Sequence, residues 1–323
     1  MISRRNFVKN VSLASFNLPL IHSFIELNAQ TEKPLTIGII GAENSHTAGY
    51  GKIFNIDKKF PGVTLKYVWG EKDEFAQKSS KDGNIPVIVK DTKEMIGKID
   101  ALIVDHRHAK YHLEAARPFV EANIPTFIDK PFCYRSDEGK DFLMMAKQKG
   151  TPVTSYSTIA HSVMTMDMSE QVKNMHVIQA VCTGTADLDS EYGGIFFYGV
   201  HLIEPIMNIF GEDIHAVKVT RNGHQGNASL RFDSGLFATL IFRSKAYGWD
   251  TLIETDKGFL PLKSNIPDTD PALSERDMIA MFRTGKEPRT HQSILNGISV
   301  LEALEKSSKT ETWTDVVYHK LGY

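Results

Sequence analysis

Residues 34–153 alternate short apolar runs with stretches of helical spacing, and no other feature of the sequence constrains the fold as strongly. The apolar runs, such as "LTIGII", "DALIVD" and "PTFID", contain few polar residues. Strands of this composition are buried on both faces, and strands that alternate with helices form a parallel sheet. We therefore expect an α/β fold whose first domain, residues 31–153, has a Rossmann-like parallel sheet with ligands at the carboxyl ends of its strands.

A different pattern begins at residue 154. Apolar and polar residues alternate over several short segments, and turn sequences such as Asp233-Ser234-Gly235 separate them. This pattern predicts a second, α+β domain over residues 154–323 with an open-faced antiparallel sheet. Helices are expected at about residues 198–210 and near residues 291–307, and we expect the later helix to pack back on the first domain.

The N-terminus resembles a twin-arginine export signal. The sequence "SRRNFVK", Ser3–Lys9, precedes a short apolar stretch, so we assign residues 1–30 to an export signal and expect a periplasmic protein that is exported folded. This stretch is too short for a membrane span, and residues that disfavour membrane insertion interrupt it at Asn17, Pro19 and His22.

Composition excludes some classes of partner. The 37 basic and 39 acidic residues are interspersed and give a net charge of -2, which offers no basic surface for nucleic acid. Cys133 and Cys182 are the only cysteines, so a disulfide framework is excluded. We expect a small neutral or weakly charged ligand. Three methionines at positions 164, 166 and 168 are interpreted as packing residues.

The turn after the first strand departs from the dinucleotide-binding motif G-x-G-x-x-G. Gly41 supplies the first glycine, but Glu43 and His46 stand at the second and third positions. A carboxylate at position 43 would repel a pyrophosphate. However, Asn44 or Ser45 can cap the following helix, and the N–H groups and dipole of a helix start can bind a phosphate.

A divalent metal is a second use for this turn. Glu43 and His46 could converge with the next strand end, which carries Asp105, His106 and His108. The spacing matches no specific metal motif, so we favour polar residues at a helix start and in a loop and expect no metal site.

Several segments, in their order along the chain, resemble the Gfo/Idh/MocA oxidoreductases. These segments are the strand ending at Gly41, "YHLEAARPFVEANIPTFIDKPF", "EYGGIFFYGVHLIE" and the late helix before "KSSKTETW". Members of this family are sugar and cyclitol dehydrogenases with a Rossmann domain followed by an open-faced antiparallel sheet. The resemblance covers nearly the whole chain after the export signal.

The resemblance implies two catalytic residues, Lys130 in "IDKPF" and His201 in "GGIFFYGVH". Oxidation of a secondary alcohol needs a base for the hydroxyl proton, and a nearby ammonium stabilises the developing alkoxide. Asp129 stands where the family has a glutamate, and Phe197 stands where it has an aspartate four residues before the histidine. Phe197 cannot orient the imidazole, so the family's catalytic pair is incomplete.

Further site residues follow from the same resemblance and from the strand ends. Cofactor contacts are expected at Gly41, Glu43, Asn44, Ser45, His46, Asp105, His112 and Asp129. Substrate contacts are expected at Tyr192 and Glu204. Glu71 or Asp73, just after the strand "VTLKYVWG", could reach the adenosine ribose.

The favoured function is an oxidoreductase that acts on a hydroxyl of a sugar, cyclitol or glycoside with NAD or NADP. We expect a homo-oligomer through the open sheet, with a small carbohydrate as its ligand. The alternative is a carbohydrate lyase, hydrolase or binding protein that keeps the fold without a cofactor.

Overall fold

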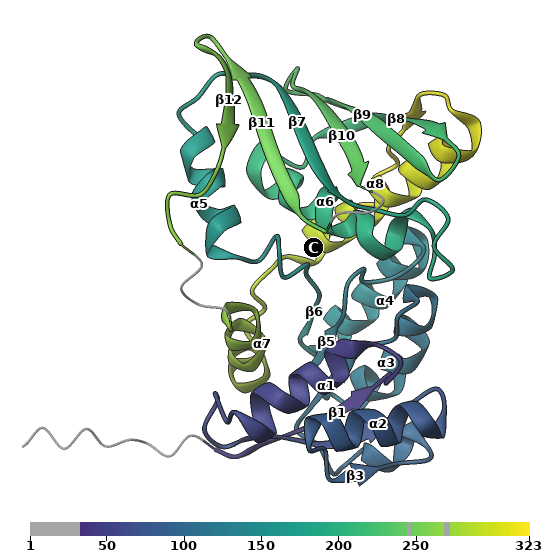
Figure 1. The fold of residues 1–323 in the computed structure, drawn as a ribbon. Coiled ribbons are helices and arrows are strands. Elements are labelled where there is room, and N and C mark those ends of the chain that lie inside the picture. Colours follow the sequence, from purple (N-terminus) through teal and green to yellow (C-terminus); the bar gives the residue numbers. More distant parts are fainter. Residues whose placement is uncertain (1–32, 244–246, 268–271) are drawn as a thin grey trace, which may run out of the picture. The chain divides into compact units, whose positions relative to one another are not determined.

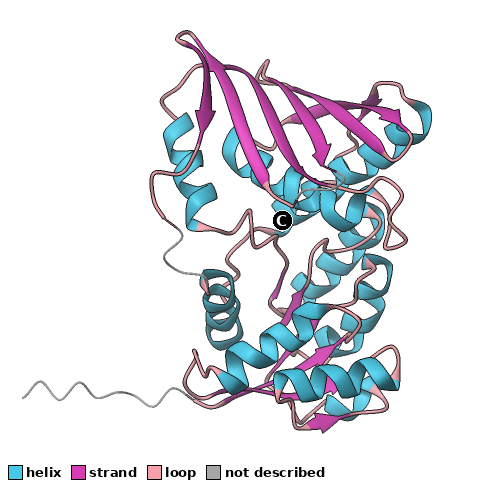
Figure 2. Ribbon diagram, in the orientation of Figure 1, coloured by secondary structure: helices cyan, strands magenta, loops and turns pink. Residues whose placement is uncertain are grey.

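The computed structural model describes residues 33–243, 247–267 and 272–323, which contain two β-sheets with helices against them (Figures 1 and 2). The proposed export signal, residues 1–30, lies outside the described residues. No helix within the described ranges combines the length and apolar character needed to cross a membrane. Both cysteines are buried and free.

The first sheet has six parallel strands in the order β3-β2-β1-β4-β5-β6. Its strands are β1 (Leu35–Ile40), β2 (Val63–Trp69), β3 (Val87–Ile88), β4 (Ala101–Val104), β5 (Thr126–Ile128) and β6 (Val153–Thr154). From β1 the chain adds β2 and β3 on one side of the sheet and then β4, β5 and β6 on the other. Dinucleotide-binding folds hold their ligand at this change of side, between β1 and β4. The expected Rossmann-like parallel sheet is therefore confirmed.

Helices cover both faces of the first sheet. Helices α1 (Ser45–Gly51) and α2 (Asp73–Gly83) lie on one face, and α7 (Leu273–Thr284) joins the same apolar core through Met278 and Phe282. Helices α3 (His112–Glu121) and α4 (Ser136–Lys149) bury Phe119 and Phe142 against the other face. Apolar side chains on both faces explain why these strands have few polar residues.

The second sheet has seven strands in the order β12-β11-β7-β10-β9-β8-β13. Its strands are β7 (Val177–Thr185), β8 (Ile214–Asn222), β9 (Gln225–Phe232), β10 (Phe237–Arg243), β11 (Trp249–Thr255), β12 (Gly258–Leu262) and β13 (Thr314–Asp315). All pairs are antiparallel except β7 and β10, which run parallel. The parallel pair forms because a helix follows β7, and the meander β8-β9-β10 then brings its third strand back beside β7.

Three helices lie against one face of the second sheet: α5 (Val163–Val172), α6 (Ile195–Phe210) and α8 (His291–Thr310) (Figure 1). Helix α6 begins three residues earlier than expected, and α5 was not expected as a helix. Helix α8 also reaches α4, where the backbone N–H of Ser136 donates to Glu302 Oε1 at 3.1 Å. The other face of the sheet carries no helix among the described residues (Figure 2).

Candidate functional site

The turn after β1 is shaped by the neighbouring strand end. Gly41 has a φ of +106°, and a Cβ atom added there would lie 2.6 Å from the backbone carbon of Asp105. Only glycine fits this close passage without strain. Gly41 is thus explained by packing against the end of β4, whether or not a cofactor approaches the turn.

Two buried carboxylates, Asp105 and Asp129, lie at the ends of β4 and β5. Asn44 caps α1 and turns its amide towards both, with Nδ2 2.9 Å from Asp105 Oδ1 and 3.3 Å from Asp129 Oδ2. Thr47 donates to Asp105 Oδ2 at 2.6 Å. Burial and the neighbouring Asp129 raise the pKa of Asp105 well above its usual range. Burial opposes ionisation of Asp129 as well, but Lys130 and His46 outweigh it and lower the pKa of Asp129.

His46, at the third position of the glycine motif, points its ring at these carboxylates. Its Nδ1 lies 3.3 Å from Asp129 Oδ2 and 3.8 Å from Asp105 Oδ1. Burial lowers the pKa of His46, but the charge and hydrogen bond of Asp129 and the charge of Asp105 together outweigh it, and the net shift is upward. The two acids therefore favour the protonated form of His46 at the start of α1.

His46, Asp105 and Asp129 offer ligand atoms within 4.8 Å of one another, the spacing of a metal-binding set. The other candidate metal ligands lie elsewhere. Glu43 faces Tyr192, the His106 ring lies 5.9 Å from that of Trp69, and the His108 ring lies 5.0 Å from that of Tyr134. Of the five residues considered for a metal, the structure brings only His46 and Asp105 together.

Glu43 points away from the turn, towards the segment that precedes α6. Its Oε1 accepts a hydrogen bond from the Tyr192 hydroxyl at 3.1 Å, and Arg107 Nη1 donates to the same hydroxyl at 2.9 Å. The Arg107 guanidinium also lies 4.0 Å from the centroid of the Tyr192 ring. The Arg107 guanidinium and the Tyr192 hydroxyl thus offset the negative charge of the Glu43 carboxylate, a group that the glycine motif does not accommodate.

Glu71 follows β2 and closes the turn from the other side. Its Oε2 accepts hydrogen bonds from the backbone N–H groups of Ala42 at 2.9 Å and Glu43 at 3.0 Å. Its Oε1 is buried and has no partner among the described residues. An unpartnered buried carboxylate oxygen is costly unless a donor reaches it.

The Lys130 ammonium lies near Asp129 and near Phe197 of α6. The side chain is 7% exposed, and Nζ lies 3.5 Å from Asp129 Oδ2 and 5.6 Å from the centroid of the Phe197 ring. The peptide between Lys130 and Pro131 is cis. The Phe197 ring thus lies near the Lys130 ammonium, and unlike an aspartate at this position it cannot accept a hydrogen bond from His201.

His201 lies one turn after Phe197 on α6 and is buried. Its Nδ1 lies 2.7 Å from the Ser157 hydroxyl. Burial, followed by the charge of Lys130, holds the pKa of His201 well below 6.5. The imidazole is therefore neutral at neutral pH, and Ser157 takes the orienting role that Phe197 cannot.

Ser157 is itself held in place by buried charges. Its backbone N–H donates to Glu204 Oε2 at 2.6 Å, and Arg289 Nη1 donates to Glu204 Oε1 at 2.6 Å. Both oxygens of Glu204 have protein partners. Glu204 therefore supports Ser157 in this structure, and the contact between Glu204 and substrate stays a prediction. No motif in the sequence marks Ser157 or Arg289, because their roles depend on contacts between distant segments.

His112 is fully buried, and both of its ring nitrogens lie beside backbone carbonyl oxygens. Its ring nitrogens lie 3.0 Å from the Pro131 carbonyl oxygen and 2.8 Å from the His106 carbonyl oxygen. His112 thus links the loop after β4 to the loop after β5. Ser45, in contrast, is an exposed first residue of α1.

Comparisons with known proteins agree with this architecture. Residues 35–157 match the model of an oxidoreductase family with an NAD-binding Rossmann fold, GFO_IDH_MocA. The uncharacterized oxidoreductase YhhX of Escherichia coli strain K12 is 24% identical over 198 residues, which cover 54% of this chain and 57% of YhhX. The chain thus aligns with little more than half of that curated relative.

Two solved structures share the fold over most of their length. GenD2 from gentamicin A biosynthesis, in complex with NAD, has a TM-score of 0.73 at 12% identity and covers 89% of this chain and 97% of its own. Scyllo-inositol dehydrogenase from Lactobacillus casei, with NAD(H) and scyllo-inositol, has a TM-score of 0.71 at 16% identity and covers 88% and 99%. These two structures show that the chain shares their fold, and residues 35–157, with the strand order of the first sheet, are similar to the NAD-binding Rossmann domain of the GFO_IDH_MocA oxidoreductase family.

Proposed function

We propose that the protein is an NAD-dependent dehydrogenase that interconverts a secondary hydroxyl of a sugar, cyclitol or glycoside and the corresponding ketone. The observation that carries the proposal is the neutral, buried imidazole of His201, oriented by Ser157 and close enough to the Lys130 ammonium for its charge to act on it. The bound inositol in the dehydrogenase of similar fold supports the substrate class.

The residues at the strand ends fit a nicotinamide dinucleotide in one specific respect. The unpartnered Glu71 Oε1 lies at the carboxyl end of β2, where dinucleotide-binding folds place the acid that accepts from the adenosine ribose hydroxyls. A ribose diol would satisfy this oxygen, whereas the 2′-phosphate of NADP would be repelled. We therefore infer a preference for NAD. The start of α1, from Asn44 to His46, would face the phosphates, and the neighbouring acids favour the protonated form of His46 there.

The chain's own residues can perform the acid–base part of the reaction. In the tautomer whose Nδ1–H donates to Ser157, the lone pair at Nε2 of His201 is free to accept the substrate's hydroxyl proton. The Lys130 ammonium would hold the same oxygen and stabilise it as it becomes an alkoxide. Phe197 and Asp129 flank the ammonium and hold it in place. When bound, the nicotinamide supplies the hydride acceptor.

The test is NADH formation with a panel of inositols, hexoses and glycosides. Lys130→Met and His201→Gln should each lower kcat by about 10²- to 10⁴-fold, the usual contribution of a positioned acid or base. Lys149→Met, an exposed position at the end of α4, is the control and should keep full activity. Full activity in both site variants, or no turnover of any polyol by the native protein, would refute the proposal and favour the cofactor-free alternative.

We also propose that the protein is exported to the periplasm, on the basis of the paired arginines in "SRRNFVK". Replacing Arg4 and Arg5 with lysine should retain the precursor in the cytoplasm. An unchanged periplasmic yield would contradict export by this route.

A further inference from the structure

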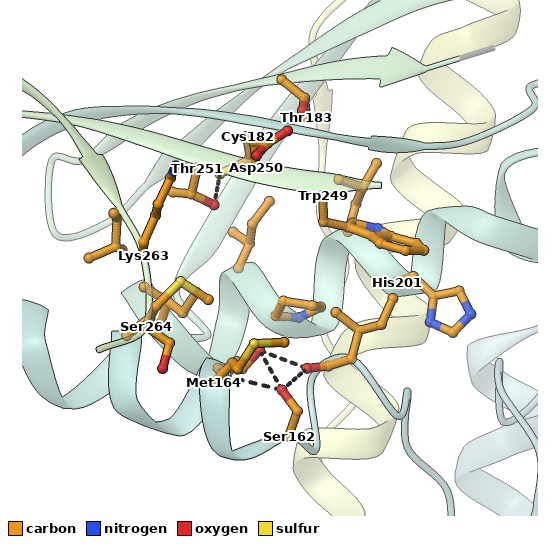
Figure 3. Close-up of a pocket in the computed structure, with 18 of the residues that line it drawn as sticks. Ser162, Met164, Cys182, Thr183, His201, Trp249, Asp250, Thr251, Lys263 and Ser264 are labelled. Carbon is orange, nitrogen blue, oxygen red and sulfur yellow. Dashed lines mark hydrogen bonds between the residues drawn. The ribbon is translucent and has the colours of Figure 1, made fainter. Parts of the chain in front are cut away.

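A cavity of about 1060 Å³ lies in the second domain, between the second sheet and helices α5 and α6 (Figure 3). His201 and Trp249 lie together at one end of it, with their ring centroids 5.9 Å apart. Most other side chains of its wall are apolar, among them Met164, Met168, Ile206, Ile209 and Leu262. The cavity therefore begins at the proposed catalytic histidine and extends away from it along α5 and α6.

The polar side chains of the wall beside α5 have partners in the protein, whereas Trp249 Nε1 and the Thr183 hydroxyl, on the strands, are buried without a partner among the described residues. Ser162 donates to the Ile159 carbonyl oxygen at 2.8 Å, and Thr165 donates to the same oxygen at 2.7 Å. His161 pairs with Asp277 at 2.6 Å. An occupant of this part of the cavity would gain little from hydrogen bonds and would be stabilised mainly by burial of apolar surface.

His201 belongs both to this cavity and to the group of polar side chains at the strand ends. It lines the cavity, and the charges of Lys130 and Asp129 also act on its imidazole. A ligand with one hydroxyl at Nε2 of His201 therefore has the cavity beside it. A single hydroxylated ring would leave most of the volume empty, because sites of about 300–1,000 Å³ hold drug-sized ligands.

We propose that the substrate carries a large apolar group, an alkyl or aromatic aglycone, which occupies this cavity while its hydroxylated ring lies at Lys130 and His201. This inference rests on the proposed dehydrogenase function and narrows its substrate class to apolar glycosides. Hydroxyl groups placed beside α5 would lose their water without new partners, so a free sugar or cyclitol is the poorer ligand for that part of the cavity.

The test compares the binding of methyl and octyl β-glucopyranoside to the full-length protein, by calorimetry below the micellar concentration. Both ligands carry the same glucose ring, so the difference in their Kd reports the contribution of the alkyl chain. Each methylene that enters an apolar site strengthens binding by about threefold to fourfold, and we expect octyl glucoside to bind at least about tenfold more tightly.

Two methionines of α5 provide a matched pair of variants. Met164 is 40% exposed and lines the cavity, whereas Met166 is 48% exposed and does not line it. Met164→Trp should reduce the advantage of the octyl chain to less than about threefold, because the indole fills the site. Met166→Trp should keep the advantage. Lys263→Trp, at an exposed lining position, is a second cavity variant if the first fails to fold.

Equal binding of the two glucosides, or equal losses in Met164→Trp and Met166→Trp, would overturn the inference. Failure of the dehydrogenase proposal has a different signature. Tight octyl binding that depends on Met164, with no NADH formed from any polyol, would refute the enzyme assignment and leave a binding site for apolar groups. Turnover of free sugars with no gain from an apolar chain would support the enzyme and refute the cavity's role.

Discussion

The Ser157 hydroxyl lies 2.7 Å from Nδ1 of His201, so a residue that follows the last strand of the first sheet orients the imidazole on a helix of the second domain. The backbone of Ser157 is held by Glu204, which is paired with Arg289. This chain of contacts replaces the acid that the family resemblance places at position 197.

Removal of the Ser157 hydroxyl should therefore impair proton transfer more than binding. We expect Ser157→Ala to lower kcat about fivefold, because a net hydrogen bond contributes about 1 kcal/mol, and to leave the KM for NAD unchanged. Ser157→Thr should restore most of the loss. Ser169→Ala removes a hydroxyl that bonds to the Asn208 carbonyl oxygen and serves as control. Steady-state kinetics measure all three, and native kcat in Ser157→Ala would contradict the orienting role.

The pH dependence of the oxidation should reflect the lowered pKa of His201. Burial and Lys130 keep the imidazole neutral as the pH falls through 6.5, so the proton acceptor remains available there. We expect kcat/KM to stay constant from pH 7.5 to about 6 and to fall only at lower pH. An acid limb centred at about 6.5, the ordinary pKa of histidine, would show that the base is not His201 in this environment.

Stability should fall in acid because of histidines outside the reaction. Burial, followed by His112, lowers the pKa of His106 to about 3, and its Nδ1 is buried without a partner in the described part of the chain. A lowered histidine pKa means that unfolding takes up a proton between that pKa and 6.5, which costs about 1.4 kcal/mol per pH unit per residue. His46 has the opposite sign, and its contribution is lost as the pH rises above 6.5.

Urea unfolding between pH 7 and 4.5 measures this effect. The free energy of unfolding should decline below pH 6.5, and His106→Phe should flatten the decline. His176→Phe, at an exposed position, is the control and should leave the slope as it is in the native protein. A slope identical in all three proteins would exclude His106 as a source of acid sensitivity.

The position of Glu71 predicts cofactor preference. Replacing Glu71 with alanine removes the acceptor for the ribose hydroxyls and the charge that repels a 2′-phosphate. We expect the Kd for NAD to rise about tenfold and the preference for NAD over NADP to shrink. Asp73→Ala removes an exposed acid that pairs with Lys90 and should leave both affinities unchanged. Calorimetry with each nucleotide measures these Kd values. A larger change in Asp73→Ala than in Glu71→Ala would assign the ribose contact to Asp73 instead.

The uncovered face of the second sheet predicts self-association. Phe237, Ile241, Leu252 and Phe259 are exposed, and their registers place them on this face of adjacent strands. Apolar patches on open sheets are typical of protein interfaces. Ile241→Glu should dissociate the oligomer, as measured by light scattering after size-exclusion chromatography, whereas Met144→Glu on α4 should not. A native protein that is monomeric at micromolar concentration would contradict the expectation.

The sequence predicted the features that depend on local patterns. Apolar runs ending at Gly41 and Asp105 marked β1 and β4, and the short polar side chain of Asn44 marked the cap of α1. Features that depend on contacts between distant segments could not be predicted from the sequence. The parallel pairing of β7 with β10 depends on the path through α6, and Ser157 reaches His201 across 44 positions of the chain.

The methionines of α5 illustrate a second limit. Spacing alone suggested packing residues, and Met168 does pack against the core, but Met164 and Met166 are partly exposed, and Met164 lines a cavity. Methionine suits both roles because its side chain is flexible and apolar. Which role applies depends on how closely α5 approaches the sheet, and no local pattern encodes that distance.

The contact between Ser157 and His201 also limits how the two halves of this protein can be recombined with those of relatives. A chimera that replaced the first sheet up to Thr154 would keep the serine with its histidine. A junction placed a few residues later, after Ala160, would exchange the serine while retaining the histidine. Domain boundaries drawn for engineering should therefore end at β6, because Ser157, three residues later, already bonds to the histidine of the second half.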